Sequence, residues 1–169
     1  AKKEADSAKT AISSAKTVGD VASAKKNGVD NINQVSIPAQ SAAKQQALTN
    51  IDDVAKAAKQ AIDKTNGITE SEKQAAQGQV DADAQAAKEA IGKADSNQAV
   101  TDAVNNGTVA INKDDANAAI DGALAEKNHS IEGAPNLTSD EKQAVKEQAK
   151  KAADSAKTAI SSAKTVGDV

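Results

Sequence analysis

Cysteine, methionine, phenylalanine, tyrosine, tryptophan and arginine are all absent from this 169-residue sequence. Because there is no Cys, the chain forms no disulfide and no thiolate metal site. Because there is no Arg or aromatic side chain, it lacks the groups that stack on bases and make bidentate contacts with phosphates. Its 21 Lys residues are interspersed with 24 acidic residues and form no basic block. The composition therefore excludes disulfide frameworks and argues against nucleic-acid binding.

Long apolar runs are missing too. No stretch approaches the roughly 18 apolar residues of a membrane span, so we expect no membrane insertion. The given sequence begins at Ala1 without an initiator Met, and we find no secretion-signal pattern within it. We therefore expect the sequence to be a fragment of a longer protein.

Small aliphatic side chains make up the apolar content. The hydrophobic fraction is 38%, and 39 of these residues are Ala, whereas the larger aliphatics are nearly all Val and Ile. Such a core lets helices approach closely but removes little apolar surface per residue. It suits slender helical bundles arranged in series better than one thick globule.

An internal repeat dominates the sequence. Residues 1–21 recur at 149–169, 148 positions further on, and differ only in having Glu4 where the second copy has Ala152. GITESEKQAAQGQV matches NLTSDEKQAVKEQA at an offset of 69, and KKNGVDNIN matches VNNGTVAIN at an offset of 79. Each long period therefore holds two unequal copies of one unit.

These offsets predict the domain organisation. Residues 1–34 form the C-terminal part of a preceding repeat unit, and residues 35–113 form a complete three-helix unit. Residues 114–169 form a second unit that is truncated at the start of its third helix. The expected fold is all-α, with tandem three-helix bundles joined end to end into an elongated rod.

The first helix of each unit is predicted from apolar residues at the i, i+3, i+4, i+7 spacing. In the complete unit it runs from about Ala39 to Lys64, with Pro38 in the first turn and Ser36 or Ile37 as the cap region. The predicted buried positions are Ile51, Val54, Ala55, Ala58 and Ile62, and in the second copy Ile120, Ala123, Leu124 and Ile131.

The second helix opens with a capping box in both copies. Thr69 with Glu72, and Thr138 with Glu141, place a hydroxyl and a carboxylate three residues apart, so each can satisfy a free backbone N–H. The predicted buried positions are Ala76, Val80, Ala84, Ala87 and Ile91, and in the second copy Val145, Ala149, Ala153, Ala156 and Ile160.

Each copy of the unit is predicted to have a third helix, with an N-cap near Thr17, Ser96 and Thr165 in the three copies. The predicted buried positions are Val21, Ala24 and Ile32 in the first copy and Val100, Val104 and Ile111 in the complete unit. Gly28 and Gly107 either end this helix or let a neighbour pack closely, and we favour close packing. No polar loop separates Ile111 from Ile120. We therefore expect the third helix of one unit to run nearly straight into the first helix of the next.

Candidate reactive groups are few. His129 is the only His, and Gln60 takes its place in the other copy, so the repeat does not require an imidazole at this position. We therefore interpret His129 as a solvated residue near a helix C-terminus. Ser13 and Ser14, with Ser161 and Ser162, are expected on a helix surface. One His without Cys cannot supply a nucleophilic triad.

The acidic pairs are Asp52–Asp53, Asp81 with Asp83, and Asp114–Asp115. Calcium needs several closely spaced oxygen ligands and a Gly turn, so we interpret these pairs as helix caps and solvated faces. We predict no catalytic, no cofactor-binding and no metal-binding residues.

Four motifs occur in order: an AID or NID helix start at Ile120 and Ile51, an LT-x-x-EK turn, an AK-x-AI helix end and an NG-x-x-x-IN segment. With them, almost the whole chain resembles the repeat called domain of unknown function 1542. That repeat occurs in wall-anchored surface proteins of Gram-positive bacteria, including staphylococcal and lactobacillar adhesins of the Ebh, SasC and FmtB type. The resemblance implies an extracellular helical stalk, cell-wall anchored through other parts of its parent protein and associated with adhesion or biofilm formation.

The expected function is a structural spacer that projects a distal binding region, without catalysis. Its expected partners are neighbouring repeats of the same chain, and we expect a monomer. An alternative is a ligand-binding helical repeat that recognises a host matrix or serum protein, although binding faces usually expose Tyr, Trp or Arg anchors. A third reading, a desiccation-protective disordered chain, conflicts with the regularly spaced Ile residues and the paired capping boxes.

Overall fold

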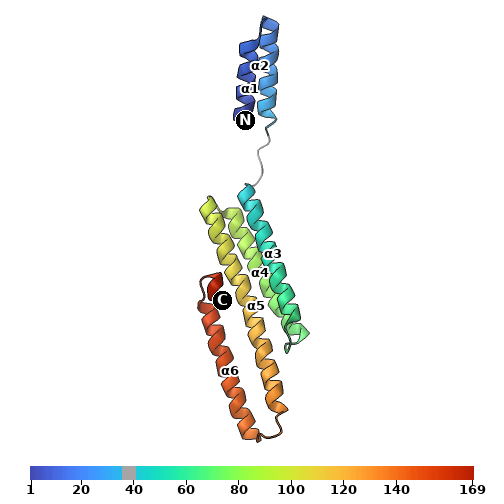
Figure 1. The fold of residues 1–169 in the computed structure, drawn as a ribbon, viewed down its shortest axis with the longest axis vertical. Coiled ribbons are helices and arrows are strands. Elements are labelled where there is room, and N and C mark those ends of the chain that lie inside the picture. The colour runs from blue at the N-terminus through green and yellow to red at the C-terminus, as the bar shows by residue number, and fades with distance from the viewer. Residues whose placement is uncertain (36–40) are drawn as a thin grey trace. The chain divides into compact units, whose positions relative to one another are not determined.

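The structure, a computed structural model, describes residues 1–35 and 41–169. These residues form α1 (Lys2–Ser14), α2 (Val18–Asn33), α3 (Ala42–Lys64), α4 (Glu70–Lys93), α5 (Asn97–Glu132), α6 (Ser139–Ser162) and the short 3₁₀ helix η1 (Val166–Asp168) (Figure 1). No strand occurs in the described residues, which confirms the all-α helical bundle. Internal contacts divide the chain into two units, Ala1–Gln40 and Ser41–Val169.

Both predicted capping boxes are present at the starts of α4 and α6. The Thr69 hydroxyl accepts the Glu72 N–H at 3.3 Å, while the Glu72 carboxylate accepts the Thr69 N–H at 2.7 Å. Thr138 and Glu141 repeat this arrangement at 3.3 and 2.8 Å. Each pair satisfies two backbone donors that a helix N-terminus leaves free, so the local sequence alone determines where these helices begin.

The start of α3 differs from the prediction. The helix begins at Ala42, after Ser41, whose side chain accepts the Lys44 N–H at 3.2 Å. The predicted start at about Ala39 is therefore three residues too early, because the Ser41 cap makes Ala42 the first helical residue; Ala39 itself lies outside the described residues. Pro38 and the cap region at residues 36–37 lie outside the described residues.

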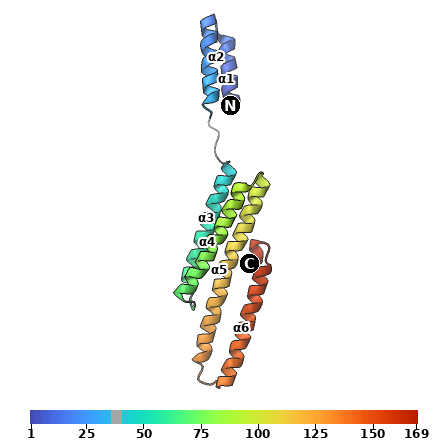
Figure 2. The ribbon, with the colours of Figure 1, turned by 180° about the vertical axis from the view of Figure 1, so that it is seen from behind.

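The core of the second unit is the three-helix bundle of α3, α4 and the N-terminal half of α5, seen from behind in Figure 2. Its fully buried side chains are Ile51, Ile62, Val80, Ile91 and Ile111. Buried Ala residues on α3 and α4 lie between these larger side chains. The small side chains let the helices pack closely, as the composition predicted.

Gly107 shows how closely the helices approach. It lies inside α5, and a Cβ added to it would come within 2.4 Å of the Ala87 Cβ on α4. Gly28 in α2 stands in the same relation to Ala8 in α1, also at 2.4 Å. The favoured reading of the two glycines, close packing and not helix termination, is confirmed.

Several predicted core positions are exposed. In the unit Ala1–Gln40, which is a hairpin of α1 and α2, Val21 is 40% exposed and Ile32 is 37% exposed. Ala123 on α5 and Ala156 on α6 are exposed as well. The periodicity identified the correct helical faces, but in both places two helices are packed where the complete bundle has three.

Candidate functional site

The most informative feature of the unit Ser41–Val169 is the junction between its two repeats, which lies within α5. This helix has 36 residues, and at 1.5 Å per residue it is about 54 Å long. Its N-terminal half packs against α3 and α4, whereas its C-terminal half runs antiparallel to α6 (Figures 1 and 2). The predicted run of one repeat's third helix into the next repeat's first helix is confirmed.

Equivalent contacts recur 69 residues apart. The Lys44 ammonium donates to the Gly92 carbonyl at 2.6 Å, and the Lys113 ammonium donates to the Ser161 carbonyl at 2.9 Å. In each repeat, a Lys from the first helix thus satisfies a free carbonyl at the end of the second helix. A cation is also favoured there by the partial negative charge of a helix C-terminus.

Ion pairs between the first and second helices follow the same offset. Lys88 on α4 pairs with Asp52 on α3, and Lys157 on α6 pairs with Asp121 on α5 at 2.5 Å. The second half of α5 therefore makes with α6 the polar contacts that α3 makes with α4. These contacts establish the repeat in three dimensions.

The turn between α3 and α4 packs directly against the second half of α5. A Cβ added at Gly122 would lie 2.4 Å from the Asn66 carbonyl oxygen and 2.6 Å from Thr65 Cγ2. From the other side, a Cβ at Gly67 would lie 2.5 Å from the Gly122 carbonyl oxygen, and Gly67 has a φ of 83° that favours glycine. The two glycines therefore let one repeat's turn rest on the next repeat's first helix. In α3 the equivalent of Gly122 is the exposed residue Asp53.

Asp114 lies at the middle of this junction and is half-buried. Burial, and secondarily the charge of nearby Asp83 on α4, raises the pKa of the Asp114 carboxyl from 3.8 to about 6. Its Oδ2 atom is buried without a hydrogen-bond partner. Burial also raises the pKa of the adjacent Asp115. The interpretation of this acidic pair as a cap or a solvated face is wrong, because both carboxyls are partly buried and Asp114 lies near Asp83 on α4.

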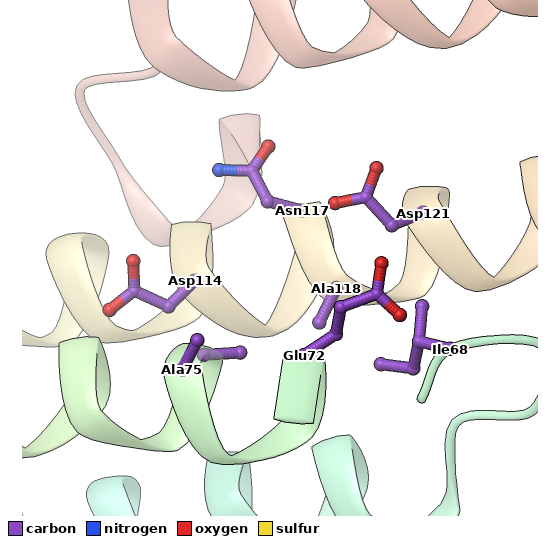
Figure 3. A pocket seen from close by; sticks show the side chains of 8 residues that line it. Ile68, Glu72, Ala75, Asp114, Asn117, Ala118 and Asp121 are labelled. Atoms are coloured by element: carbon purple, nitrogen blue, oxygen red, sulfur yellow. The ribbon is translucent and has the colours of Figure 1, made fainter. Parts of the chain in front are cut away.

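A pocket of about 300 Å³ opens beside Asp114, and its lining residues are shown in Figure 3. Two of its carboxylates already have partners: Glu72 is bound by Thr69, and Asp121 is paired with Lys157. The hydrogen bonds from Thr69 hold the pKa of Glu72 below its usual value. The carboxylates of Asp114 and Asp121 lie apart along α5 and do not converge on one centre (Figure 3).

The other candidates lie where the sequence placed them. His129 is exposed in the last turn of α5. Ser161 and Ser162 are exposed, and their hydroxyls donate to the Thr158 carbonyl of their own helix at 2.9 and 3.0 Å. Across residues 1–35 and 41–169, no cluster of three His, Asp or Glu side chains could hold a metal ion. No helix among these residues has the length and apolarity required to cross a bilayer.

Sequence reasoning missed Gly122 and Asp114 as junction residues. A lone Gly inside a helical pattern was the available signal for Gly122, because such a Gly often marks close packing. For Asp114 no such signal existed, since its burial results from helices that are distant in the sequence.

Comparison with known proteins agrees with this geometry. The model of the family described as Domain of Unknown Function (DUF1542) matches residues 43–114 and 112–169. The two matches meet at residues 112–114, in the middle of α5. No curated protein and no solved structure matches the chain. The two family matches together span most of the sequence, and the chain therefore belongs to the DUF1542 family.

Proposed function

We propose that these repeats act as a spacer in the stalk of a bacterial cell-surface adhesin, where they hold a distal binding region away from the cell wall and carry out no catalysis. The observation that supports this proposal is the sharing of α5 by two repeats. A spacer needs successive repeats to keep a defined separation, and a helix common to both provides it.

The physical reason is that bending at this junction has a high cost. Bending α5 near Asp114 would break backbone hydrogen bonds of a continuous helix. It would also separate Gly122 from the turn at Asn66, where the closest approach is to the backbone carbonyl oxygen of Asn66. Each repeat therefore limits the motion of its neighbour, as in other linear repeat arrays.

The surface composition supports the same proposal. Within the described residues 41–169, Val166 in η1 is the only exposed large hydrophobic side chain. Partner-binding surfaces usually concentrate large apolar or aromatic anchors. A surface of Lys, acidic and amide side chains is suited to remaining solvated while it spans a distance.

The test measures the stiffness of the junction. Because the chain has no Cys, spin labels can be attached at two engineered sites, Ser71→Cys on α4 and Ser155→Cys on α6, which are both exposed. Pulsed electron paramagnetic resonance should give a narrow distribution of label separations. Asp115→Pro should broaden it, because a Pro inside a helix removes a hydrogen bond and clashes with the preceding turn.

The matched control places Pro where a helix accepts it. Glu70→Pro lies at the first residue of α4, where a missing N–H has no intrahelical partner to lose, and it should leave the distribution narrow. A broad distribution in the unsubstituted chain would contradict a spacer. So would a parent protein whose adhesion depends on one helical face of these repeats and not on their number.

A further inference from the structure

Three Asn–Gly pairs occur in the sequence, at residues 27–28, 66–67 and 106–107. In such a pair the next backbone nitrogen can attack the Asn side-chain amide, because Gly has no Cβ to obstruct the approach. The reaction needs a backbone that can rotate and an N–H that no helical carbonyl holds. The three pairs therefore differ in reactivity according to where the fold places them.

Two of the pairs lie inside helices. Gly28 is in α2 and Gly107 is in α5, and both are buried against a neighbouring helix. Within an α-helix the backbone N–H donates to the carbonyl four residues earlier, and both backbone dihedral angles are fixed. The side chains of Asn27 and Asn106 therefore reach a free nitrogen only when the helix opens locally.

The third pair, Asn66–Gly67, lies in the turn between α3 and α4. Both residues are exposed and outside any helix. Among the described residues, the Gly67 N–H has no backbone hydrogen-bond partner, so no backbone hydrogen bond has to break before its nitrogen reacts. The equivalent turn between α5 and α6 has Pro135 and Asn136 in these places, followed by Leu137, whose side chain obstructs the same attack. Of the two turns, the one between α3 and α4 therefore has the reactive pair.

We propose that Asn66–Gly67 is a self-modification site, which converts Asn66 to isoaspartate and so detaches the turn from Gly122. The Gly67 nitrogen gives its proton to hydroxide and bonds to the side-chain carbonyl carbon of Asn66, and the side-chain nitrogen leaves as ammonia. Water then opens the resulting succinimide ring. Opening at the main-chain carbonyl gives isoaspartate, and opening at the side-chain carbonyl gives Asp. The net reaction consumes water and releases ammonia.

The isoaspartate product changes the group that touches α5. A Cβ at Gly122 would lie 2.4 Å from the Asn66 carbonyl oxygen, so this carbonyl rests directly on the helix. In isoaspartate the main chain runs through the former side chain, and the former main-chain carbonyl becomes a carboxylate whose charge is costly to desolvate. The main chain of the turn is also one carbon longer, whereas the space between Gly67 and Gly122 does not admit even a Cβ. Asp, in contrast, alters only an exposed side chain.

The modification therefore makes the junction between the two repeats looser as the protein ages. It does not reverse, because the ammonia is lost to solvent. The reaction at Asn66 depends on the turn alone and not on a spacer function, so the two proposals can fail separately.

Peptide mapping by mass spectrometry tests the reaction. Trypsin releases residues 65–73, a peptide in which Asn66 is the single Asn. When the folded chain is kept in warm, mildly alkaline buffer, this peptide should gain about 1 Da as the amide becomes an acid. Asn27 and Asn106 should react at least about 10-fold more slowly, because their helices have to open first. Asn136 should also react more slowly, because a bulky side chain follows it.

Isoaspartyl methyltransferase identifies the product, since it transfers a methyl group from S-adenosylmethionine to isoaspartate and not to Asp. The peptide of residues 65–73 should be methylated after the incubation and not before it. The proposal is overturned if Asn66 reacts no faster than Asn106 or Asn136, or if its product is Asp without isoaspartate.

The spin-label pair Ser71→Cys and Ser155→Cys measures the consequence at the junction. The distribution of label separations should broaden as isoaspartate accumulates. The matched control is Asn66→Gln, whose longer side chain has to close a six-membered ring and reacts far more slowly, so its distribution should stay narrow over the same incubation. Freshly prepared Asn66→Asp should also give a narrow distribution, because its charge lies on the exposed side chain and not on the carbonyl that touches Gly122.

Three results in this measurement would overturn the proposal. They are an unchanged distribution after Asn66 has become isoaspartate, equal broadening in Asn66→Gln, and a broad distribution in fresh Asn66→Asp. The unsubstituted chain before incubation is a second reference for the narrow distribution. If that chain is already broad, the spacer is contradicted, and the mass measurements still decide whether Asn66 modifies itself.

Discussion

Replacing Asp114 with Asn should stabilise the unit Ser41–Val169 at neutral pH and have little effect near pH 4. In the folded chain, burial and the charge of Asp83 raise the pKa of Asp114 to about 6, above its usual 3.8. The folded state therefore keeps a proton that the unfolded chain releases. The stabilisation that the folded state gains by keeping this proton on Asp114 is fully present below about pH 3.8 and is lost as the pH rises through about 6.

The size of the effect follows from this shift. A change from 3.8 to about 6 corresponds to about 3 kcal/mol in the free energy of unfolding. Asp114 is partly exposed, and water screens its charge, so we expect about 1–2 kcal/mol at pH 7. Asn has nearly the same shape and no charge, so the variant should keep the packing of α4 against α5.

Urea unfolding followed by far-UV circular dichroism measures this effect, since the chain has no Trp or Tyr fluorescence. The difference in the free energy of unfolding between Asp114→Asn and the unsubstituted chain should grow from near zero at about pH 4 to its full value at about pH 7. Glu72 and Glu141 have lowered pKa values, so their effect on the free energy of unfolding changes with pH in the opposite direction. Both chains contain these residues, and their effect cancels in the difference between the two chains. Asp53→Asn, at an exposed residue, is the control. If Asp114→Asn raised the free energy of unfolding equally at about pH 4 and about pH 7, the argument would be refuted.

Three further predictions, each with substitutions compared by chemical denaturation, test the packing and the caps. Gly122→Ala should destabilise the chain by about 1–3 kcal/mol because its Cβ meets backbone, whereas Gly78→Ala, with open space around it, should stabilise it by about 0.5–1 kcal/mol. Ile91→Asp should abolish the helicity of its bundle, since it buries an unpaired charge. Glu89→Ala should leave the helicity nearly unchanged. Equal effects of the two substitutions would mean that the helical faces are wrongly assigned. Thr69→Ala should cost about 1 kcal/mol through the lost cap, and no loss would contradict the capping box.

The starts of the helices were largely predictable from local sequence. The capping boxes at Thr69 and Thr138 depend on residues three apart, and such interactions form within one helical turn. The cap at Ser41 was missed because several residues between 36 and 41 offered competing signals. The helix starts with two reciprocal partners were therefore predicted correctly, as was the single-residue cap at Ser96, whereas the single-residue cap at Ser41 was not.

Burial was predictable only where the whole bundle is present. The periodicity of Ile and Ala predicted the same face for α2 as for the first half of α5, yet Ile32 is 37% exposed and Ile111 is fully buried. A helical period identifies which face is apolar, but it does not say whether another helix covers that face. The same reason explains the exposure of Ala156.

The sequence by itself determined the helical fold, the repeat, the positions of the capping boxes and the close-packing role of Gly28 and Gly107, because each follows from spacing along one chain. Only the tertiary structure decided that Gly122 receives the turn at Asn66 and that Asp114 is half-buried. Those two features arise where segments distant in sequence meet, and the distance between such segments is set by packing and not by any local pattern.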